Sequence, residues 1–167
     1  MNTQTKKHWR SWLLYLLFFL VVMQAVNWWK TRDAVSGNLS KFTGELMDGT
    51  AFKISEFTGK PVLFHLWATW CPICELENCT IQSISQDYQV ISIASWSEGE
   101  AAVKAYMRNK QLTFPVMLDT SGKLAQSFGL KGVPTSFILD PNGEITFVET
   151  GYSTEPGLRL RLWLSTL

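Results

Sequence analysis

The sequence is poor in charge, in histidine and in cysteine. Charged residues make up 17% of its 167 residues, and the formal net charge is +1. A nucleic-acid interface needs basic side chains gathered on one face, so this balance argues against that function. Three cysteines are too few for a framework of disulfides. A structural zinc site needs four ligands, and the chain offers at most its three cysteines with His65.

The sequence also lacks internal repeats and low-complexity segments. Its 167 residues leave room for one compact domain with a short appendage. Hydrophobic residues make up 46% of the chain, a bias typical of a membrane segment or of a large core. The order of residues along the chain predicts both.

The appendage is an apolar segment near the N-terminus. Residues 12–29 contain eighteen residues without a charge, and at 1.5 Å per helical residue they nearly cross a hydrocarbon core of about 30 Å. Tryptophans at both ends of the segment are typical of the membrane interface. A cleaved signal peptide is the alternative, but the small residues of a cleavage site do not follow the apolar stretch. The segment therefore predicts a single transmembrane helix.

Basic residues before this segment set its orientation. Under the positive-inside rule, residues 1–11 lie in the cytoplasm and the remainder of the chain lies outside it. We expect an anchor at residues 12–29, a linker at 30–40 and a folded domain at 41–167.

Strand and helix patterns alternate along the folded domain. Asp48-Gly49 stands between two short strand-like runs and predicts a hairpin, because glycine adopts the positive φ of a tight turn. Apolar runs of strand length predict buried strands, and apolar residues at helical spacing predict helices between them. The first of these helices has Leu76, Ile81 and Ile84 as candidate inward residues. The order predicts an α/β fold, a parallel sheet with helices packed on its faces. The predicted strands are 61–68, 88–95, 114–118, 135–139 and 145–148, and the predicted helices are 74–86, 98–110, 123–128 and 158–164.

The motif WATWCPIC stands where the central strand ends and a helix begins. Cys71 should lie at the helix N-terminus, where free backbone N–H groups and the helix dipole favour a thiolate and lower the pKa of the thiol. Pro72 suits the first helical turn, because its missing N–H is not needed there. Cys74 lies one turn further on, where it can resolve a mixed disulfide formed at Cys71. The motif predicts a redox pair, with an inert structural disulfide as the alternative.

A second motif, GVPTSFILDPNGEI, starts at Gly132, just before a predicted strand. Together the two motifs resemble the thioredoxin superfamily, and the resemblance covers residues 42–151. The anchor, the hairpin and a glutamate three residues after Cys74 are similar to the TlpA/ResA/DsbE branch of that superfamily. The segments SWSEGEAAVKAYM and GYSTEPGLRLRLWL look most similar to ScsD, a membrane-anchored group of the suppressor-of-copper-sensitivity proteins.

The resemblance implies a thioredoxin-like fold, with a central mixed sheet flanked by helices, and a protein-disulfide oxidoreductase. It implies a cis bond between Val133 and Pro134 that faces Cys71, where backbone edges bind the extended chain of a partner. Trp70 and Pro72 are expected to line the same surface. No cofactor is expected beyond the disulfide of the pair.

The resemblance also implies partners and a location. The expected partners are protein disulfides or thiols and a membrane electron carrier that recycles the pair. The expected location is the inner membrane, with the domain in the periplasm or another extracytoplasmic space. Reduction of partner disulfides is the favoured direction, although the CPIC sequence itself does not fix it.

Three further residues have roles that the sequence leaves open. Glu77 matches a buried glutamate of the branch and could exchange a proton with Cys74; the alternative is an exposed residue of the first turn. His65 stands where thioredoxins carry a buried aspartate. It could relay protons, but a core histidine bonded to a backbone carbonyl is favoured. Cys79 is expected to be a small buried hydrophobic residue.

The main competing function is copper binding through the three thiols, in line with the similarity to ScsD. The sequence argues against it, because anchored copper chaperones of related fold use a Cys-x3-Cys pair with a distant histidine. A peroxidase is a weaker alternative, because Cys71 has its resolving partner three residues away and the Thr-x-x-Cys pattern is missing.

Overall fold

The computed structural model describes residues 12, 14–19, 21–22, 34–57 and 59–167. The chain divides into two compact units, residues 1–32 and 33–167. No helix within the described ranges is long and apolar enough to cross a membrane. Half of the predicted anchor and all of residues 1–11 lie outside the described residues, so both assignments stay predictions.

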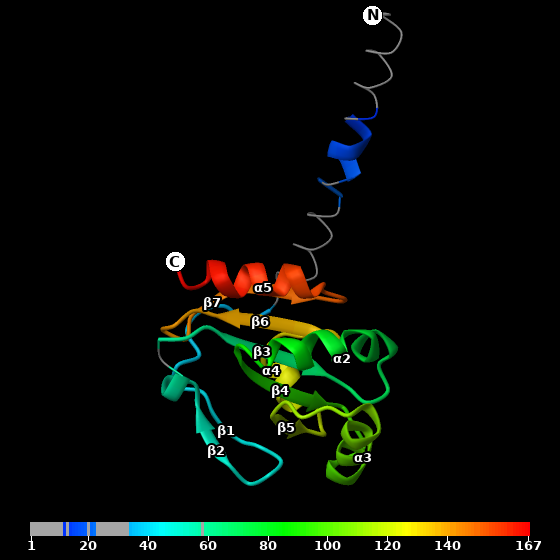
Figure 1. The fold of residues 1–167 in the computed structure, drawn as a ribbon, viewed down its shortest axis with the longest axis vertical. Helices are drawn as coiled ribbons and strands as arrows, with labels where there is room; N and C mark the ends of the chain where they lie inside the picture. The colour runs from blue at the N-terminus through cyan, green and yellow to red at the C-terminus, as the bar shows by residue number, and fades with distance from the viewer. Residues whose placement is uncertain (1–11, 13, 20, 23–33, 58) are drawn as a thin grey trace, which may run out of the picture. The chain divides into compact units, whose positions relative to one another are not determined.

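The second unit is built on a five-stranded mixed sheet (Figure 1). The strands stand in the order β5-β4-β3-β6-β7; β3, β4 and β5 run parallel, whereas β6 and β7 run antiparallel to their neighbours. The mixed sheet that the resemblance implied is confirmed, and the parallel sheet expected from simple alternation holds only for its first three strands. The bounds are β3 (Val62–Trp67), β4 (Gln89–Ser95), β5 (Val116–Asp119), β6 (Thr135–Leu139) and β7 (Ile145–Thr150).

Helices cover both faces of the sheet and define two layers. The α2 layer contains α2 (Pro72–Ile84), α3 (Glu100–Lys110) and α5 (Glu155–Leu164), packed against Leu63 and Trp67 of β3. The α4 layer contains α4 (Lys123–Ser127) and the 3-10 helix η1 (Ile54–Phe57), packed against Phe64 and Leu66. All six residues of β3 are buried, because the strand is central and covered on both faces.

The predicted N-terminal hairpin is confirmed. β1 (Thr43–Glu45) pairs antiparallel with β2 (Ala51–Lys53), and Gly49 supplies a φ of +87° in the turn between them. Beyond β1, Leu46 pairs with Met117, so the hairpin covers part of the exposed edge of β5.

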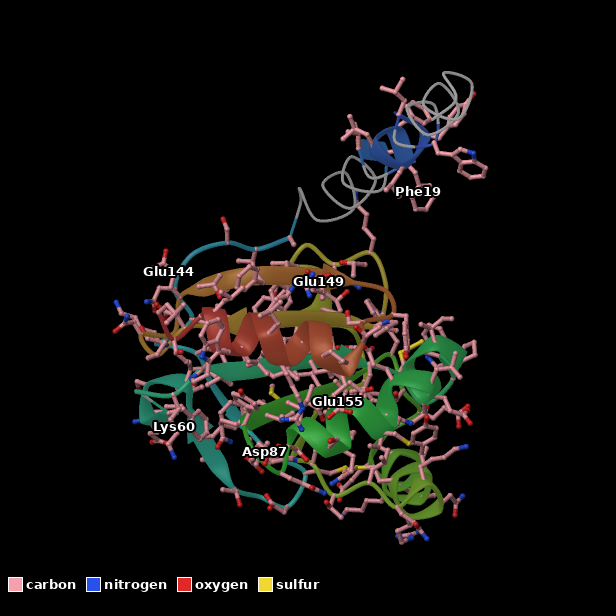
Figure 2. All side chains as sticks on the ribbon, turned by 45° about the horizontal axis from the view of Figure 1, so that its top comes forward. Phe19, Lys60, Asp87, Glu144, Glu149 and Glu155 are labelled. Atoms are coloured by element: carbon pink, nitrogen blue, oxygen red, sulfur yellow. A yellow bond between two sulfur atoms is a disulfide. The ribbon has the colours of Figure 1, made fainter. Side chains whose placement is uncertain are left out.

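An ion-pair cluster fastens α5 to the end of α2. The Arg159 guanidinium contacts the carboxylates of Asp87 and Glu155, each at 2.8 Å. Figure 2 labels both acidic residues, Asp87 in the turn after α2 and Glu155 at the start of α5. This attachment holds the loop between β7 and α5 in a fixed place relative to α2.

One inward position of α2 was predicted wrongly. Leu76 is 68% exposed, whereas Cys74, Glu77 and Asn78 are buried together with two isoleucines. The buried face follows helical spacing from Cys74 onward, and it includes polar residues. Apolar periodicity therefore favours Leu76 as the inward residue, whereas the buried position belongs to Glu77.

Candidate active site

The redox pair lies at the carboxyl end of β3. The strand ends at Trp67 and α2 begins at Pro72, so Cys71 is the residue that caps the helix. Its sulfur accepts a hydrogen bond from the backbone N–H of Cys74 at 3.1 Å. The two cysteines are joined by a disulfide, with 5.3 Å between their Cα atoms. The predicted position of Cys71 at the helix N-terminus is confirmed.

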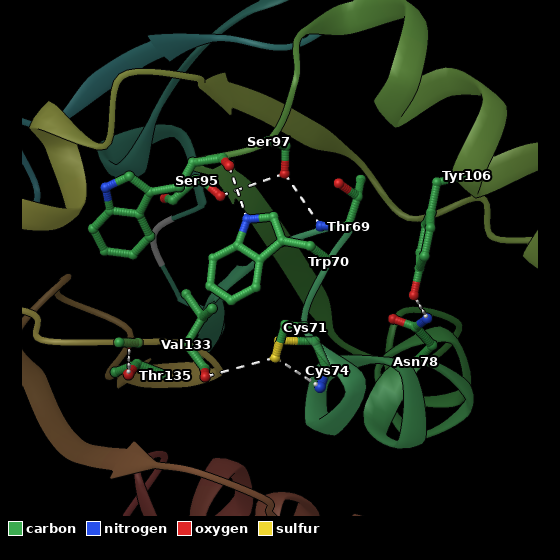
Figure 3. The surroundings of a disulfide bond; sticks show 12 residues. Thr69, Trp70, Cys71, Cys74, Asn78, Ser95, Ser97, Tyr106, Val133 and Thr135 are labelled. Atoms are coloured by element: carbon green, nitrogen blue, oxygen red, sulfur yellow. Dashed lines mark hydrogen bonds between the residues drawn. A yellow bond between two sulfur atoms is a disulfide. The ribbon is translucent and has the colours of Figure 1, made fainter.

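The second motif folds against the first. The bond between Val133 and Pro134 is cis, and the Val133 carbonyl oxygen lies 3.7 Å from Cys71 Sγ (Figure 3). The two segments meet because β6, which follows Pro134, pairs antiparallel with β3. The Pro134 carbonyl in turn accepts the N–H of Gly151, at the end of β7. The predicted juxtaposition is therefore confirmed.

Glu77 is a fully buried carboxyl group on the inner face of α2. Its Oε1 accepts the backbone N–H of Ser153 at 2.9 Å, while its Oε2 is buried without a hydrogen-bond partner among the described residues. Burial raises the pKa of Glu77 to about 7, and the Ser153 N–H opposes part of that rise. The alternative of an exposed first-turn residue is excluded by this burial. A carboxyl group with such a pKa can take up or release a proton at neutral pH.

His65 is a second buried titratable group, on β3. Burial lowers the pKa of its imidazole to about 3, so the ring is neutral at physiological pH. Its Nδ1 lies 2.9 Å from the Ser136 hydroxyl, on the strand paired with β3. The expected burial is confirmed, but this partner is a side-chain hydroxyl and not the expected backbone carbonyl.

The two tryptophans of the motif have different environments. Trp67 is fully buried, donates to the Ser92 hydroxyl at 3.2 Å and packs edge-on against Phe114. Trp70 is 61% exposed beside the disulfide, and its indole N–H donates to the Trp96 carbonyl at 2.9 Å. Sequence reasoning missed Trp96, because a backbone carbonyl acting as acceptor leaves no residue-specific signal.

Cys79 was predicted to be buried and is in fact exposed. It lies five residues after Cys74, which turns it away from the inner face of α2 and toward a surface that Gln82 and Lys110 also line. Within the described residues, no group of three or more His, Cys, Asp or Glu side chains is placed to hold a metal ion.

A thioredoxin-like fold with a Cys-x-x-Cys pair that caps α2 and faces a cis-proline loop defines a thiol-disulfide oxidoreductase of the thioredoxin superfamily. The chain belongs to the Redoxin family, which matches residues 35–160.

Similar proteins cover most of the chain. The thioredoxin-like protein of Haemophilus influenzae is 29% identical over 162 residues, 96% of each chain. The thiol-disulfide oxidoreductase ResA of Bacillus subtilis is 30% identical over 139 residues, 80% of this chain and 77% of ResA. The crystal structure of a thioredoxin-family thiol:disulfide interchange protein from Chlorobium tepidum is 26% identical with a TM-score of 0.68, and the match covers 80% of this chain and 98% of that one. The pneumococcal exposed lipoprotein thioredoxin Etrx1 is 26% identical with a TM-score of 0.65, over 74% of this chain and 98% of that one.

These likenesses support the ResA/DsbE-like branch. The similarity to ScsD and the copper-binding alternative stay predictions.

Proposed function

We propose that the chain is a membrane-tethered, extracytoplasmic oxidoreductase that reduces disulfides in partner proteins. The observation that carries the proposal is the Cys71–Cys74 pair at the N-terminus of α2, with the Val133 carbonyl 3.7 Å from the first sulfur. The helix N-terminus stabilises a thiolate at Cys71, and the loop beside it offers backbone groups to a partner chain.

The proposed reaction exchanges one disulfide for another. In the reduced protein, the Cys71 thiolate attacks one sulfur of the partner disulfide, and the other partner sulfur leaves as a thiolate that takes a proton from water. The Cys74 thiolate then attacks Cys71 Sγ, which closes the Cys71–Cys74 disulfide and expels the second partner thiolate. Two electrons pass to the partner. A membrane electron carrier returns them to the pair, and the cycle needs no cofactor other than the disulfide.

Glu77 is the proposed proton acceptor for Cys74. Both side chains lie on the buried face of α2, three residues apart, where they share one turn of the helix. With a pKa of about 7, the carboxyl group is present in both protonation states under working conditions. Its unbonded oxygen leaves a lone pair available for the Cys74 proton.

The partner chain is proposed to bind along the loop that contains Val133 and Pro134. Val133 is half-buried, and its carbonyl faces Cys71. An extended chain paired with this backbone would bring its disulfide over the Cys71 sulfur. Pro72 and Trp70 are both exposed and border the same sulfur.

The membrane tether is supported by the N-terminal segment. The described residues between 12 and 22 are helical and carry large exposed apolar side chains, among them Phe19 (Figure 2). The match to the Haemophilus influenzae protein is too long to be confined to residues 34–167. An exposed lipoprotein is among the similar structures, in line with an extracytoplasmic domain.

Reduction of a protein disulfide by the full chain in detergent tests the activity. Insulin with dithiothreitol as electron donor is a suitable assay. Cys71→Ser should lower the rate to the level of dithiothreitol alone, because a hydroxyl is not a nucleophile toward disulfides at neutral pH. Cys79→Ser is the matched control and should retain the wild-type rate, since Cys79 is exposed and outside the pair. Full activity in Cys71→Ser would refute the proposal.

The direction of electron flow requires a measurement in cells. If the protein is a reductant, rapid acid quenching and alkylation should find the pair mostly reduced, and Cys74→Ala should accumulate mixed disulfides with its partners. A pair found fully oxidised at steady state would overturn the proposed direction and leave the exchange chemistry standing.

A further inference from the structure

Trp70 is an exposed side chain that is nevertheless held in place. Its indole is 61% exposed next to Cys71, yet the indole N–H donates to the Trp96 carbonyl at 2.9 Å (Figure 3). The N–H of the preceding residue, Thr69, donates to the Ser97 hydroxyl at 3.2 Å. Two neighbouring residues of the loop after β4 thus bind the two residues that precede Cys71.

Trp96 presents its carbonyl from an unusual backbone conformation. Its φ is +51°, in the left-handed region that bulky residues rarely adopt. The ring lies over Gly122, where a Cβ atom would come within 1.8 Å of the indole nitrogen, so position 122 has to be glycine for the ring to fit. Such conformations persist only when the surrounding structure determines them, and they occur often at functional sites.

The neighbouring residues supply that support. The Trp96 N–H donates to the Asp119 carbonyl at 3.1 Å. The Asp119 carboxylate accepts from Ser95 and from two N–H groups at the start of α4. Ser97 also donates to the Ser95 carbonyl at 3.4 Å. A chain of hydrogen bonds thus runs from α4 through the loop after β4 to Trp70.

We propose that Trp96 is a positioning residue, whose left-handed backbone fixes the Trp70 indole as a rigid apolar platform beside Cys71. The platform selects partner segments with an apolar side chain next to their reactive cysteine. This inference rests on the proposed exchange with partner disulfides and adds the partner's local sequence to it.

The surroundings of the platform fit an apolar segment. Ile73, Leu76 and Tyr152 are also exposed, at 41%, 68% and 56%. The first two lie on α2 next to the pair. Tyr152 follows Gly151, whose N–H donates to Pro134 in the proposed docking loop. The charge of Glu75, on the same helix, is balanced by an ion pair with Lys110. Exposed apolar side chains are therefore present on α2 and in the loop after β7, in addition to Trp70.

The test uses two peptides, each with one cysteine held in a mixed disulfide with glutathione. The peptides differ only in the residue beside that cysteine, which is leucine in one and serine in the other. Pre-reduced full chain in detergent is mixed with excess peptide, and the maximal rate and half-saturating concentration are measured in a single turnover. The rate of exchange with hydroxyethyl disulfide is measured in parallel, and each peptide rate is divided by it to correct for changes in thiol reactivity. We expect the wild type to prefer the leucine peptide about tenfold, through the half-saturating concentration.

Substitutions at position 96 separate the effect of the backbone conformation on this preference from the effect of the indole ring. Trp96→Asn and Trp96→Val both remove the ring, but only asparagine readily keeps the left-handed conformation. Trp96→Asn should therefore keep most of the preference, whereas Trp96→Val should reduce it to about twofold. Trp163→Val, which removes a 54% exposed tryptophan from α5, should leave the preference unchanged. The ¹⁹F resonance of fluorotryptophan-labelled Trp70, assigned with Trp70→Phe, should shift or broaden in Trp96→Val and much less in Trp96→Asn.

Each failure has a distinct meaning. A wild type that exchanges with hydroxyethyl disulfide but treats both peptides alike would overturn the inference and leave the proposed function intact. Loss of preference in both Trp96 variants, or in neither, would overturn the role of the backbone. A wild type that exchanges with no disulfide at all would overturn the proposed function itself.

Discussion

Two buried carboxylates, Asp119 beside α4 and Glu77 on α2, differ in how many hydrogen bonds they accept. Asp119, at the end of β5, accepts three hydrogen bonds: Leu124 N–H at Oδ1, and Ala125 N–H and the Ser95 hydroxyl at Oδ2. Among the described residues Glu77, on α2, accepts one hydrogen bond at Oε1 and none at Oε2. Both are buried, so this difference does not reflect access to water.

The comparison separates structural from chemical roles. A buried carboxylate with donors on both oxygens is compensated, and it fixes the start of α4 and the loop after β4. A buried carboxyl group with one oxygen unpaired is uncompensated as an anion, so the fold favours its protonated form. The α4 layer is thus built for rigidity, and the α2 layer keeps a group that can change its charge beside the redox pair.

The largest effect should come from breaking the α4 layer. Phe64 is fully buried on β3, and its ring packs edge-on against Phe42 and Phe128. The distances between ring centroids are 5.3 Å and 5.8 Å. Phe64→Ala should lower the free energy of unfolding by about 3–5 kcal/mol, measured by urea denaturation. Phe57→Ala, at a half-buried position, is the control and should cost clearly less. Equal losses of unfolding free energy in the two variants would show that the aromatic packing around Phe64 adds no stability beyond that of a half-buried phenylalanine.

The next effect tests the charge of Glu77 through pH. The pKa of this carboxyl group is about 7 in the folded protein, against an ordinary glutamate value of 4.5 in the unfolded chain. Between these values the folded protein holds a proton that the unfolded chain has released, so the free energy of unfolding falls as pH rises. The loss should total roughly 3 kcal/mol between about pH 4.5 and 7 and then level off.

Urea denaturation of the oxidised protein across that pH range measures this loss. Glu77→Gln should remove it, because the amide does not titrate, whereas Glu75→Gln, at an exposed carboxylate of the same helix, should change the curve much less. A Glu77→Gln curve parallel to that of the wild type would show that Glu77 does not hold a proton at neutral pH.

A smaller effect compares the two carboxylates directly by isosteric amides. Asp119→Asn replaces an acceptor oxygen by a donor and leaves part of its hydrogen-bond network unmade, so it should cost about 1–3 kcal/mol at pH 8. Glu77→Gln at the same pH removes a poorly compensated buried charge and should cost less than about 1 kcal/mol, or stabilise the protein. Equal costs would contradict the division of roles between the two carboxylates.

The features that could be predicted from the sequence are those marked by specific side chains or by apolar periodicity. Cys71, Cys74 and the loop at Pro134 could be predicted, because motifs of specific side chains mark them. The strands and helices could be predicted because apolar periodicity marks their buried faces. The periodicity placed Leu76 inward because it takes no account of buried polar side chains, and Glu77 in fact occupies that face.

What could not be predicted depends on backbone groups brought together over long distances. The Ser153 N–H donates to the Glu77 carboxyl group, 76 residues away in the sequence. The Trp96 carbonyl accepts from the Trp70 indole, 26 residues away. Every residue offers such groups apart from the N–H of proline, so no residue type marks them in the sequence. The pKa of Glu77 follows from these contacts and from burial, which only the folded structure determines.

The smallest effect compares two sulfurs within the α2 layer itself. In the oxidised protein Cys71 is 5% exposed and Cys74 is fully buried, and the Cys74 N–H points at Cys71 Sγ. After reduction, the helix N-terminus should lower the pKa of Cys71, while α2 shields Cys74. Limiting iodoacetamide should therefore label Cys71 at least about tenfold faster than Cys74, since the thiolate is the reactive form.

Peptide mass spectrometry separates the sites, and the exposed Cys79 gives the reference rate for an ordinary surface thiol. Labelling of Cys71 should persist at pH 6, about two and a half units below the ordinary pKa of a free cysteine. If Cys74 were labelled first across neutral pH, the roles of attacking and resolving cysteine would have to be exchanged, and Glu77 would then lie beside the wrong sulfur for the proton transfer proposed above.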